Sequence, residues 1–375
     1  DGLFRVRVLH LRLSLAHPIG AELPHRQSRT PERSRMTQLA KTLSIRSSPH
    51  IGAVSSVDSI MFNVVLAMLP ACLYAVYAFG LAALLVLVTA VASCVITEHL
   101  LCRMAGQAST VSDWSVVITG MLYGMVLPPS LPLWMVAVGG VIGVSLGKFL
   151  FGGLGKNLFN PALVGRAILQ AAFPAAMTSW PSMPTNRFVA VPPSTLALPL
   201  AKPDYDGISA ATPLANWKFN EEPTAGIDLM MGSVSGSTGE TCALLIIVGG
   251  LYLVARGMMS WRIPVAILAT VALFSATLHL VDPERYAGPI FMLMSGGLML
   301  GAGFMATDMV ASPMSHLGSV VYGVLIGVLV VLIRVWGGMP EGVMYAILIA
   351  NAVSPHIDHW IQPRVYGKTS PGGTA

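Results

Sequence analysis

The chain has 375 residues, of which 54% are hydrophobic and only 10% are charged. Ordinary soluble domains carry roughly 25% charged residues, so this composition excludes a typical soluble enzyme. The formal net charge is +5, but nine of the 22 Lys and Arg residues precede Ile51, and the rest of the chain holds 13 basic and 14 acidic side chains. Because no basic surface with interleaved aromatic residues is indicated, nucleic acid is not an expected partner.

The N-terminal segment, residues 1–57, is mostly polar, and we expect it to lie in the cytoplasm. Its first part, residues 1–35, is rich in Arg and has no apolar run long enough to cross a membrane. A secretory signal fits poorly, because Arg12 interrupts the short apolar run at residues 8–15 and no small-residue cleavage site follows that run. We expect residues 1–35 to be disordered or an artefact of the assigned start, with the functional chain beginning at Met36.

The apolar runs that follow are long enough to cross the roughly 30 Å hydrocarbon core as helices. We predict an all-α polytopic membrane protein with ten transmembrane helices, some short or broken, in two inverted five-helix repeats at 58–174 and 239–361. The expected spans are 59–79, 81–101, 112–128, 131–151, 160–174, 239–256, 262–281, 287–306, 316–336 and 341–361. Residues 175–238 link the repeats, and residues 362–375 form a tail.

The orientation follows from the Lys and Arg residues of the short connections, which concentrate on the cytoplasmic side of membrane proteins. This bias places both termini in the cytoplasm and residues 175–238 outside it. Because five spans is an odd number, the two halves have opposite orientations, as in inverted-repeat membrane folds. Gly-rich runs at 147–165 and 296–313 each contain an Asn or Asp followed by a Pro, and they predict broken helices in both halves.

Several titratable residues lie in or at the ends of the expected spans. They are Glu98, His99, Asp113, Lys148, Arg166, Asp308 and Asp358. Charges at such positions usually pair, face a cavity or serve transport. Asp113 flanks the short third span and Asp308 flanks the broken eighth span, so both are candidates for ion coupling; helix capping at the membrane surface is the alternative.

Metal binding by side chains of this chain is not expected. The four Cys residues are widely separated and form no CxxC pair, which argues against a cluster or zinc site. His356 and His359 have a spacing that two metal ligands could use, but no third ligand is near them in the sequence. We also expect no side chain to act as an acid or base catalyst.

The segment between the halves contains the motif that carries the chemistry. Residues 206–212 read Asp-Gly-Ile-Ser-Ala-Ala-Thr, which resembles the recognition sequence of flavin transferases, Asp-x-x-Ser/Thr-Gly-Ala-Thr/Ser. In that pattern the last hydroxyl is esterified to the phosphate of FMN. Asp206, Ser209, Ala211 and Thr212 match it, whereas Ala210 stands where the pattern usually has Gly. Because a threonine hydroxyl is a poor nucleophile without an activating base or metal, a separate flavin transferase is an expected partner.

Further motifs extend the resemblance to a family. The run GKNLFNPA at 155–162, the run FMATD at 304–308 and the ten-span layout are similar to RnfD, a membrane protein of the Rnf electron-transport complex. A close relative of RnfD is NqrB, which belongs to the sodium-translocating NADH:quinone reductase. The resemblance to this RnfD/NqrB family covers essentially all of the chain from Met36 onwards.

This resemblance implies a flavoprotein subunit of an ion-motive ferredoxin:NAD oxidoreductase in the bacterial inner membrane, with covalent FMN on Thr212. Its partners would be the other Rnf subunits, including iron–sulfur and flavin subunits, within the lipid bilayer. The chain has neither a nicotinamide fingerprint nor cluster cysteines, so its electrons must come from such a partner. The resemblance leaves open a second, noncovalent flavin and the choice between sodium and protons. Two alternatives are an NqrB of the quinone reductase and a urea- or ammonium-type solute channel, which two inverted sets of five spans also suit.

Overall fold

The computed structural model describes residues 56–107, 109–181, 188, 191–199, 211–220, 224–232, 234–239 and 242–362. The chain divides into two units, Asp1–Ser56 and Val57–Ala375, and the described helices all belong to the second. The expected N-terminal segment before Ser56 and the tail after residue 362 lie outside the described residues.

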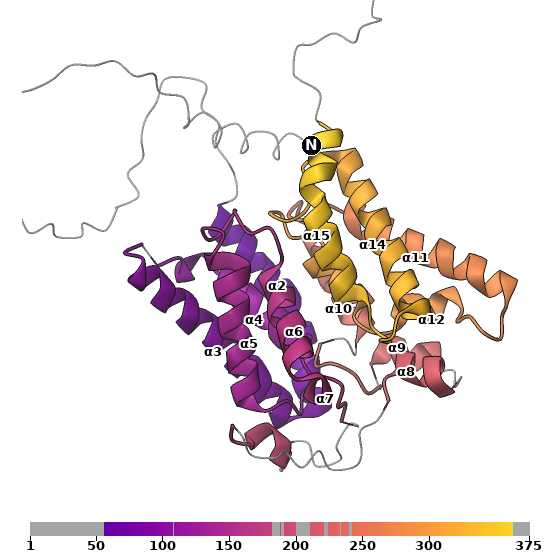
Figure 1. Cartoon of the computed structure of the whole chain (residues 1–375), viewed down its shortest axis with the longest axis horizontal. Helices are drawn as coiled ribbons and strands as arrows, with labels where there is room; N and C mark the ends of the chain where they lie inside the picture. The colour runs from indigo at the N-terminus through magenta and orange to yellow at the C-terminus, as the bar shows by residue number, and fades with distance from the viewer. Residues whose placement is uncertain are drawn as a thin grey trace, which may run out of the picture. The chain divides into compact units, whose positions relative to one another are not determined.

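The first half of the second unit is a bundle of apolar helices, drawn from indigo to magenta in Figure 1. Their bounds are Val57–Phe79 (α2), Leu81–Met104 (α3), Ser115–Met125 (α4), Leu133–Val144 (α5) and Pro161–Ala172 (α6). A short 3-10 turn, Val111–Asp113 (η2), precedes α4, and α5 runs on into a π-helical turn, Ser145–Phe149 (η3). Only Gly80 separates α2 from α3, and its φ of 72° is a conformation that glycine adopts without a steric penalty.

The segment between the halves contains short helices separated by irregular chain. They are Pro174–Met177 (α7), Pro193–Leu196 (η4), Pro213–Ala215 (α8), Asn216–Asn220 (η5) and Gly226–Met231 (α9). Three of them begin with Pro, which suits the first turn of a helix because its fixed φ matches and its missing N–H would have no partner there. The segment is therefore structured at several points along its length.

The second half repeats the helical pattern, in orange and yellow in Figure 1. Its elements are Ala243–Ala255 (α10), Arg262–Val281 (α11), Pro289–Met294 (α12), Leu298–Leu300 (α13), Gly301–Met305 (η6), His316–Trp336 (α14) and Val343–Trp360 (α15). The span expected at 287–306 is interrupted between α12 and α13, where Gly296 has a φ of 64°. The π-helical turn η6 directly follows α13 at the end of this span, as the π-helical turn η3 directly follows α5.

Four of the described helices are long and apolar enough to cross a membrane, namely α2, α3, α11 and α14. Shorter apolar helices lie at Ser115–Met125, Leu133–Phe149 and Ala243–Ala255. The described part of the chain is helical and contains no β-strand. The prediction of a helical, multi-pass membrane protein is confirmed, whereas the count of ten spans stays a prediction.

Part of the helix packing recurs in the two halves. In the first half α3 packs against α4 and α5, and α5 packs against α6. In the second half α11 packs against α12 and α14, and α14 packs against α15. Between the halves, α2 contacts α10, and α6 contacts α15.

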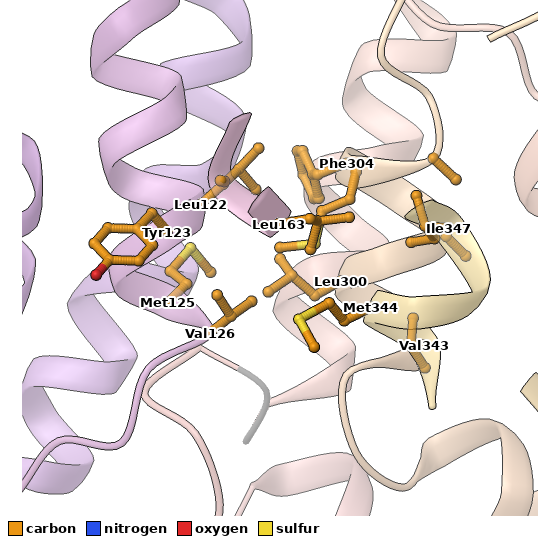
Figure 2. Close-up of a cluster of buried hydrophobic side chains, with 14 of the residues drawn as sticks. Leu122, Tyr123, Met125, Val126, Leu163, Leu300, Phe304, Val343, Met344 and Ile347 are labelled. Atoms are coloured by element: carbon orange, nitrogen blue, oxygen red, sulfur yellow. The ribbon is translucent and has the colours of Figure 1, made fainter. Parts of the chain in front are cut away.

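An apolar cluster fills the space between the two halves. Figure 2 shows Leu122, Met125 and Val126 from α4 and its end, together with Leu163 from α6, facing side chains of the second half. Those side chains are Leu300 from α13, Phe304 from the π-turn η6, and Val343, Met344 and Ile347 from α15. Close van der Waals packing of these side chains holds the two halves together, since lipid tails are as apolar as the side chains themselves and give little hydrophobic driving force within a membrane.

Close helix contact in the first half depends on glycine. A Cβ on Gly143 in α5 would lie 2.8 Å from the carbonyl oxygen of Pro161 and 3.2 Å from Cα of Gly165 in α6. Gly143→Ala should therefore destabilise the protein by about 1–3 kcal/mol, because backbone atoms must move apart. The measurement is the midpoint of thermal unfolding in detergent. Gly250→Ala in α10 is the matched control: its Cβ meets only Met259 Cε at 3.9 Å, and equal destabilisation of both variants would contradict this explanation.

Candidate functional site: a cavity beside Thr212

A cavity of about 350 Å³ lies against the segment that carries Thr212. Its walls come from α6, from α15 and the residues before it, from the end of α4 and from the segment between the halves. Most of the lining is apolar, including Leu163, Trp180, Phe219 and Met344. Its polar lining side chains include those of Arg166, Gln170, Thr178, Thr212 and Glu341. Cavities of this size, with apolar walls and a few polar groups, are typical of small-molecule and cofactor sites.

Thr212 lies at the edge of this cavity and is nearly buried, with 6% of its surface exposed. Its backbone is extended, and Pro213 starts the short helix α8 directly after it. The Thr212 hydroxyl oxygen accepts a hydrogen bond of 3.3 Å from the backbone N–H of Ala215, so the residue caps α8. Ala211 also lines the cavity, whereas Asp206 and Ser209 lie outside the described residues.

Lys218 fixes the same segment to the second half. Its Nζ donates to the carbonyl oxygens of Arg334 (2.9 Å) and Met339 (3.4 Å) and also to that of Gly337. These carbonyls lie at and just beyond the C-terminal end of α14, where backbone acceptors have no partner within the helix and cations bind favourably. Partial burial lowers the pKa of the Lys218 ammonium group. The contact holds the chain after Thr212 in place, beside the cavity.

An ion pair crosses the cavity wall between the halves. Arg166 Nη2 on α6 lies 2.8 Å from Glu341 Oε2, and the two side chains are 9% and 18% exposed. The guanidinium group of Arg334 lies near the Glu341 carboxylate. A Cβ atom added to Gly296 would lie 3.0 Å from Glu341 Oε1 and 3.3 Å from Arg334 Nη2, so both groups lie close to the same point. Arg334 also donates to the carbonyl oxygens of Met292 and Ser295, which the break after α12 releases from helical hydrogen bonding.

A second polar cluster lies in the first half, around Lys148 on the π-turn η3. Lys148 Nζ bonds both carboxylate oxygens of Glu98, at 2.7 and 2.8 Å, and the Ser115 hydroxyl at 2.8 Å. That hydroxyl donates to Asp113 Oδ1 at 2.6 Å, and the same oxygen accepts the Ser115 N–H at 2.9 Å. Asp113 therefore both caps the start of α4 and joins the buried Glu98–Lys148 pair through a hydrogen bond.

Asp308 has different partners, which join the Gly-rich runs of the two halves. Its Oδ2 accepts a hydrogen bond of 3.3 Å from Asn157, and its Oδ1 accepts the backbone N–H of Val310 at 3.0 Å. Asn160, in the same run as Asn157, donates to the carbonyl oxygen of Met305 at 3.3 Å. The two Gly-rich runs, which resemble each other in sequence, are therefore also in direct contact.

No sequence pattern indicates that Glu341 or Lys218 belongs to the site. Glu341 stands at the start of an expected span, 175 positions from Arg166, and no sequence signal pairs the two. Arg166 itself was identifiable as a charge within an apolar span. Among the described residues, no group of three or more His, Cys, Asp or Glu side chains is arranged to hold a metal ion.

Taken together, the apolar helices, the buried ion pairs within them and the cofactor-sized cavity define a multi-pass helical membrane protein with a cavity between its halves. The family described as NQR2, RnfD, RnfE matches residues 44–367. The chain belongs to this family, and the recognition made from its motifs is confirmed.

Three similar relatives are D subunits of ion-translocating complexes. The relative from the proton-translocating ferredoxin:NAD(+) oxidoreductase complex of Clostridium ljungdahlii is 39% identical, over 88% of this chain and 98% of the relative. The one from the Na(+)-translocating ferredoxin:NAD(+) oxidoreductase complex of Acetobacterium woodii is 41% identical, over 87% and 96%. The one from the ion-translocating oxidoreductase complex of Alcanivorax borkumensis is 38% identical, over 87% and 98%.

Proposed function

We propose that this chain is the membrane subunit of an ion-motive ferredoxin:NAD oxidoreductase and carries FMN covalently on Thr212. The observation that carries the proposal is the position of Thr212 at the edge of a cofactor-sized cavity. The match of residues 206–212 to the flavin attachment pattern supports it independently. A phosphoester on the Thr212 oxygen would leave the attached group beside the cavity.

The residues around the cavity fit a flavin. The apolar side chains would contact the isoalloxazine ring and exclude water, and Arg166 and Gln170 offer hydrogen-bond donors to its polar edge. The bound flavin would supply electron transfer, while the protein provides position and electrostatics. Lys218 and the α8 cap would keep the attachment residue at the cavity. The nearly buried Thr212 must become accessible during attachment, so the transferase would act before this segment has packed.

The topology that we propose has ten membrane crossings in two inverted repeats, at 58–174 and 239–361. The part of the helix packing that recurs and the two π-turns support this arrangement. Both termini would then be cytoplasmic, and residues 175–238, with the flavin, would lie on the outer side of a bacterial inner membrane. An odd number of crossings in each half is what gives the halves opposite orientations.

The partners that we propose are the other subunits of the complex, including iron–sulfur and flavin subunits, and a flavin transferase during maturation. The three relatives named above are all D subunits, aligned over nearly their full length, which favours this role over that of NqrB in the sodium-translocating NADH:quinone reductase. A solute channel would have no need of a covalent flavin. The chain produced with the transferase should therefore give a yellow-fluorescent band on a denaturing gel under ultraviolet light, and a dark band would contradict the proposal.

Asp113 and Asp308 are our candidates for ion coupling. Asp308→Asn keeps an acceptor for the Val310 N–H but removes the negative charge between the two Gly-rich runs. We expect at least a tenfold loss of ion transport by the purified complex in vesicles, with the covalent flavin retained. Asp113→Asn should have a similar effect through its link to Lys148.

The matched control for both variants is Asp282→Asn, because Asp282 also accepts a nearby backbone N–H, that of Arg285 at 3.2 Å. This variant should transport normally. Wild-type ion transport by both Asp308→Asn and Asp113→Asn would contradict a role in ion coupling. The two carboxylates would then only bond the nearby backbone N–H groups.

A further inference from the structure

The charged groups beside Thr212 suggest a role beyond attachment. Arg166 and Glu341 both line the cavity, form an ion pair of 2.8 Å and are largely buried. Arg334 lies close to Glu341, because atoms of both side chains lie within 3.3 Å of the position that a Cβ atom added to Gly296 would take. The cavity is otherwise mainly apolar, so these charges act there with little screening by solvent.

We propose that Arg166 and Glu341 set the reduction potential of the flavin, with opposite effects on it. This inference rests on the covalent flavin proposed above. A flavin that takes up an electron without a proton gains one negative charge. A nearby guanidinium lowers the energy of that added charge, and a nearby carboxylate raises it. Arg166 would therefore raise the potential, and Glu341 would lower it.

The walls of the cavity make this influence strong. Both charged groups line the same cavity, whose walls are mainly apolar, so solvent and salt screen them little there. A ring attached through Thr212 and seated there would be close to both charged groups. Because the ion pair lies where α6 meets the chain before α15, its charges are also fixed relative to both halves.

A purely structural ion pair would behave differently. If Arg166 and Glu341 only held the halves together, loss of either charge would break the same contact and produce similar effects. Electrostatic tuning instead predicts shifts of opposite sign. The sign of the shift therefore separates the two roles.

The test is a redox titration of the purified, full-length, flavin-carrying chain with dithionite, which gives electrons to the flavin and is itself oxidised. Flavin absorbance follows the titration. We expect Arg166→Gln to lower the one-electron equilibrium constant for flavin reduction by about tenfold, or about 59 mV, and Glu341→Gln to raise it by a similar factor. Arg166→Lys keeps the charge and should stay near the wild-type potential.

The titration separates failure of the tuning role from failure of covalent flavin attachment. A wild-type chain without bound flavin would refute covalent attachment, whereas a flavin with unchanged potential in both Gln variants would overturn the tuning role. Shifts of the same sign would also overturn it. If Arg166→Gln does not fold, the other two variants still test the tuning role. That role requires a higher flavin reduction potential in Glu341→Gln and an unchanged potential in Arg166→Lys.

Discussion

Thr212→Ala is expected to lose the covalent flavin completely. The substitution removes the only atom through which the proposed phosphoester could form, and no adjacent hydroxyl remains in the described stretch 211–220. The chain, produced in a host with the flavin transferase, should therefore give no fluorescent band on a denaturing gel. Thr212→Ser keeps a hydroxyl at this position, and it should retain a fluorescent band.

Thr178→Ala is the matched control for this loss. Thr178 also lines the cavity, but it lies outside the attachment motif, and its hydroxyl bonds the carbonyl oxygens of Pro174 and Ala175. This variant should fluoresce like the wild type. Persistent fluorescence of Thr212→Ala would place the attachment elsewhere, and loss in Thr178→Ala would mean that an intact cavity is itself needed for attachment.

Lys148→Met should strongly destabilise the first half. The Glu98 carboxylate would lose its two hydrogen bonds to Lys148 while staying buried, since both side chains are 4% exposed. Removing one member of a buried ion pair costs about 3–5 kcal/mol, because an uncompensated charge is left. The expected result is a markedly lower midpoint of thermal unfolding for the purified chain in detergent.

The double variant Lys148→Met/Glu98→Gln tests the reason for this loss. Neither member of the ion pair is then charged, so the double variant should recover much of the lost stability. Lys156→Met is the control for removing a lysine from the same Gly-rich run, since Lys156 is exposed. If the double variant were no more stable than Lys148→Met, packing rather than charge would explain the effect.

The helices were predictable from the sequence because each long apolar run needs its backbone hydrogen bonds satisfied locally. The break near Gly296 was also predictable, since Gly-rich sequence favours interruption, and the structure has it between α12 and α13. The π-turns were not, because no residue type at Ser145–Phe149 or Gly301–Met305 distinguishes a π-turn from an α-helix.

The site was only partly accessible from the sequence. A local motif predicts Thr212 as the attachment residue, because the flavin transferase that we propose would read contiguous residues. The contacts around the cavity join distant segments: Glu341 meets Arg166 only when α6 and α15 pack together, and Lys218 meets carbonyls more than 100 positions away. Such contacts depend on how the halves pack, which no single stretch of sequence specifies.

Intact mass spectrometry of the full-length chain, produced together with its flavin transferase, tests the central claim most directly. We predict that the measured mass exceeds that of the polypeptide by one FMN less one water, and that peptide mapping places this increment on Thr212. An unmodified mass, or an increment on a peptide without Thr212, would contradict it.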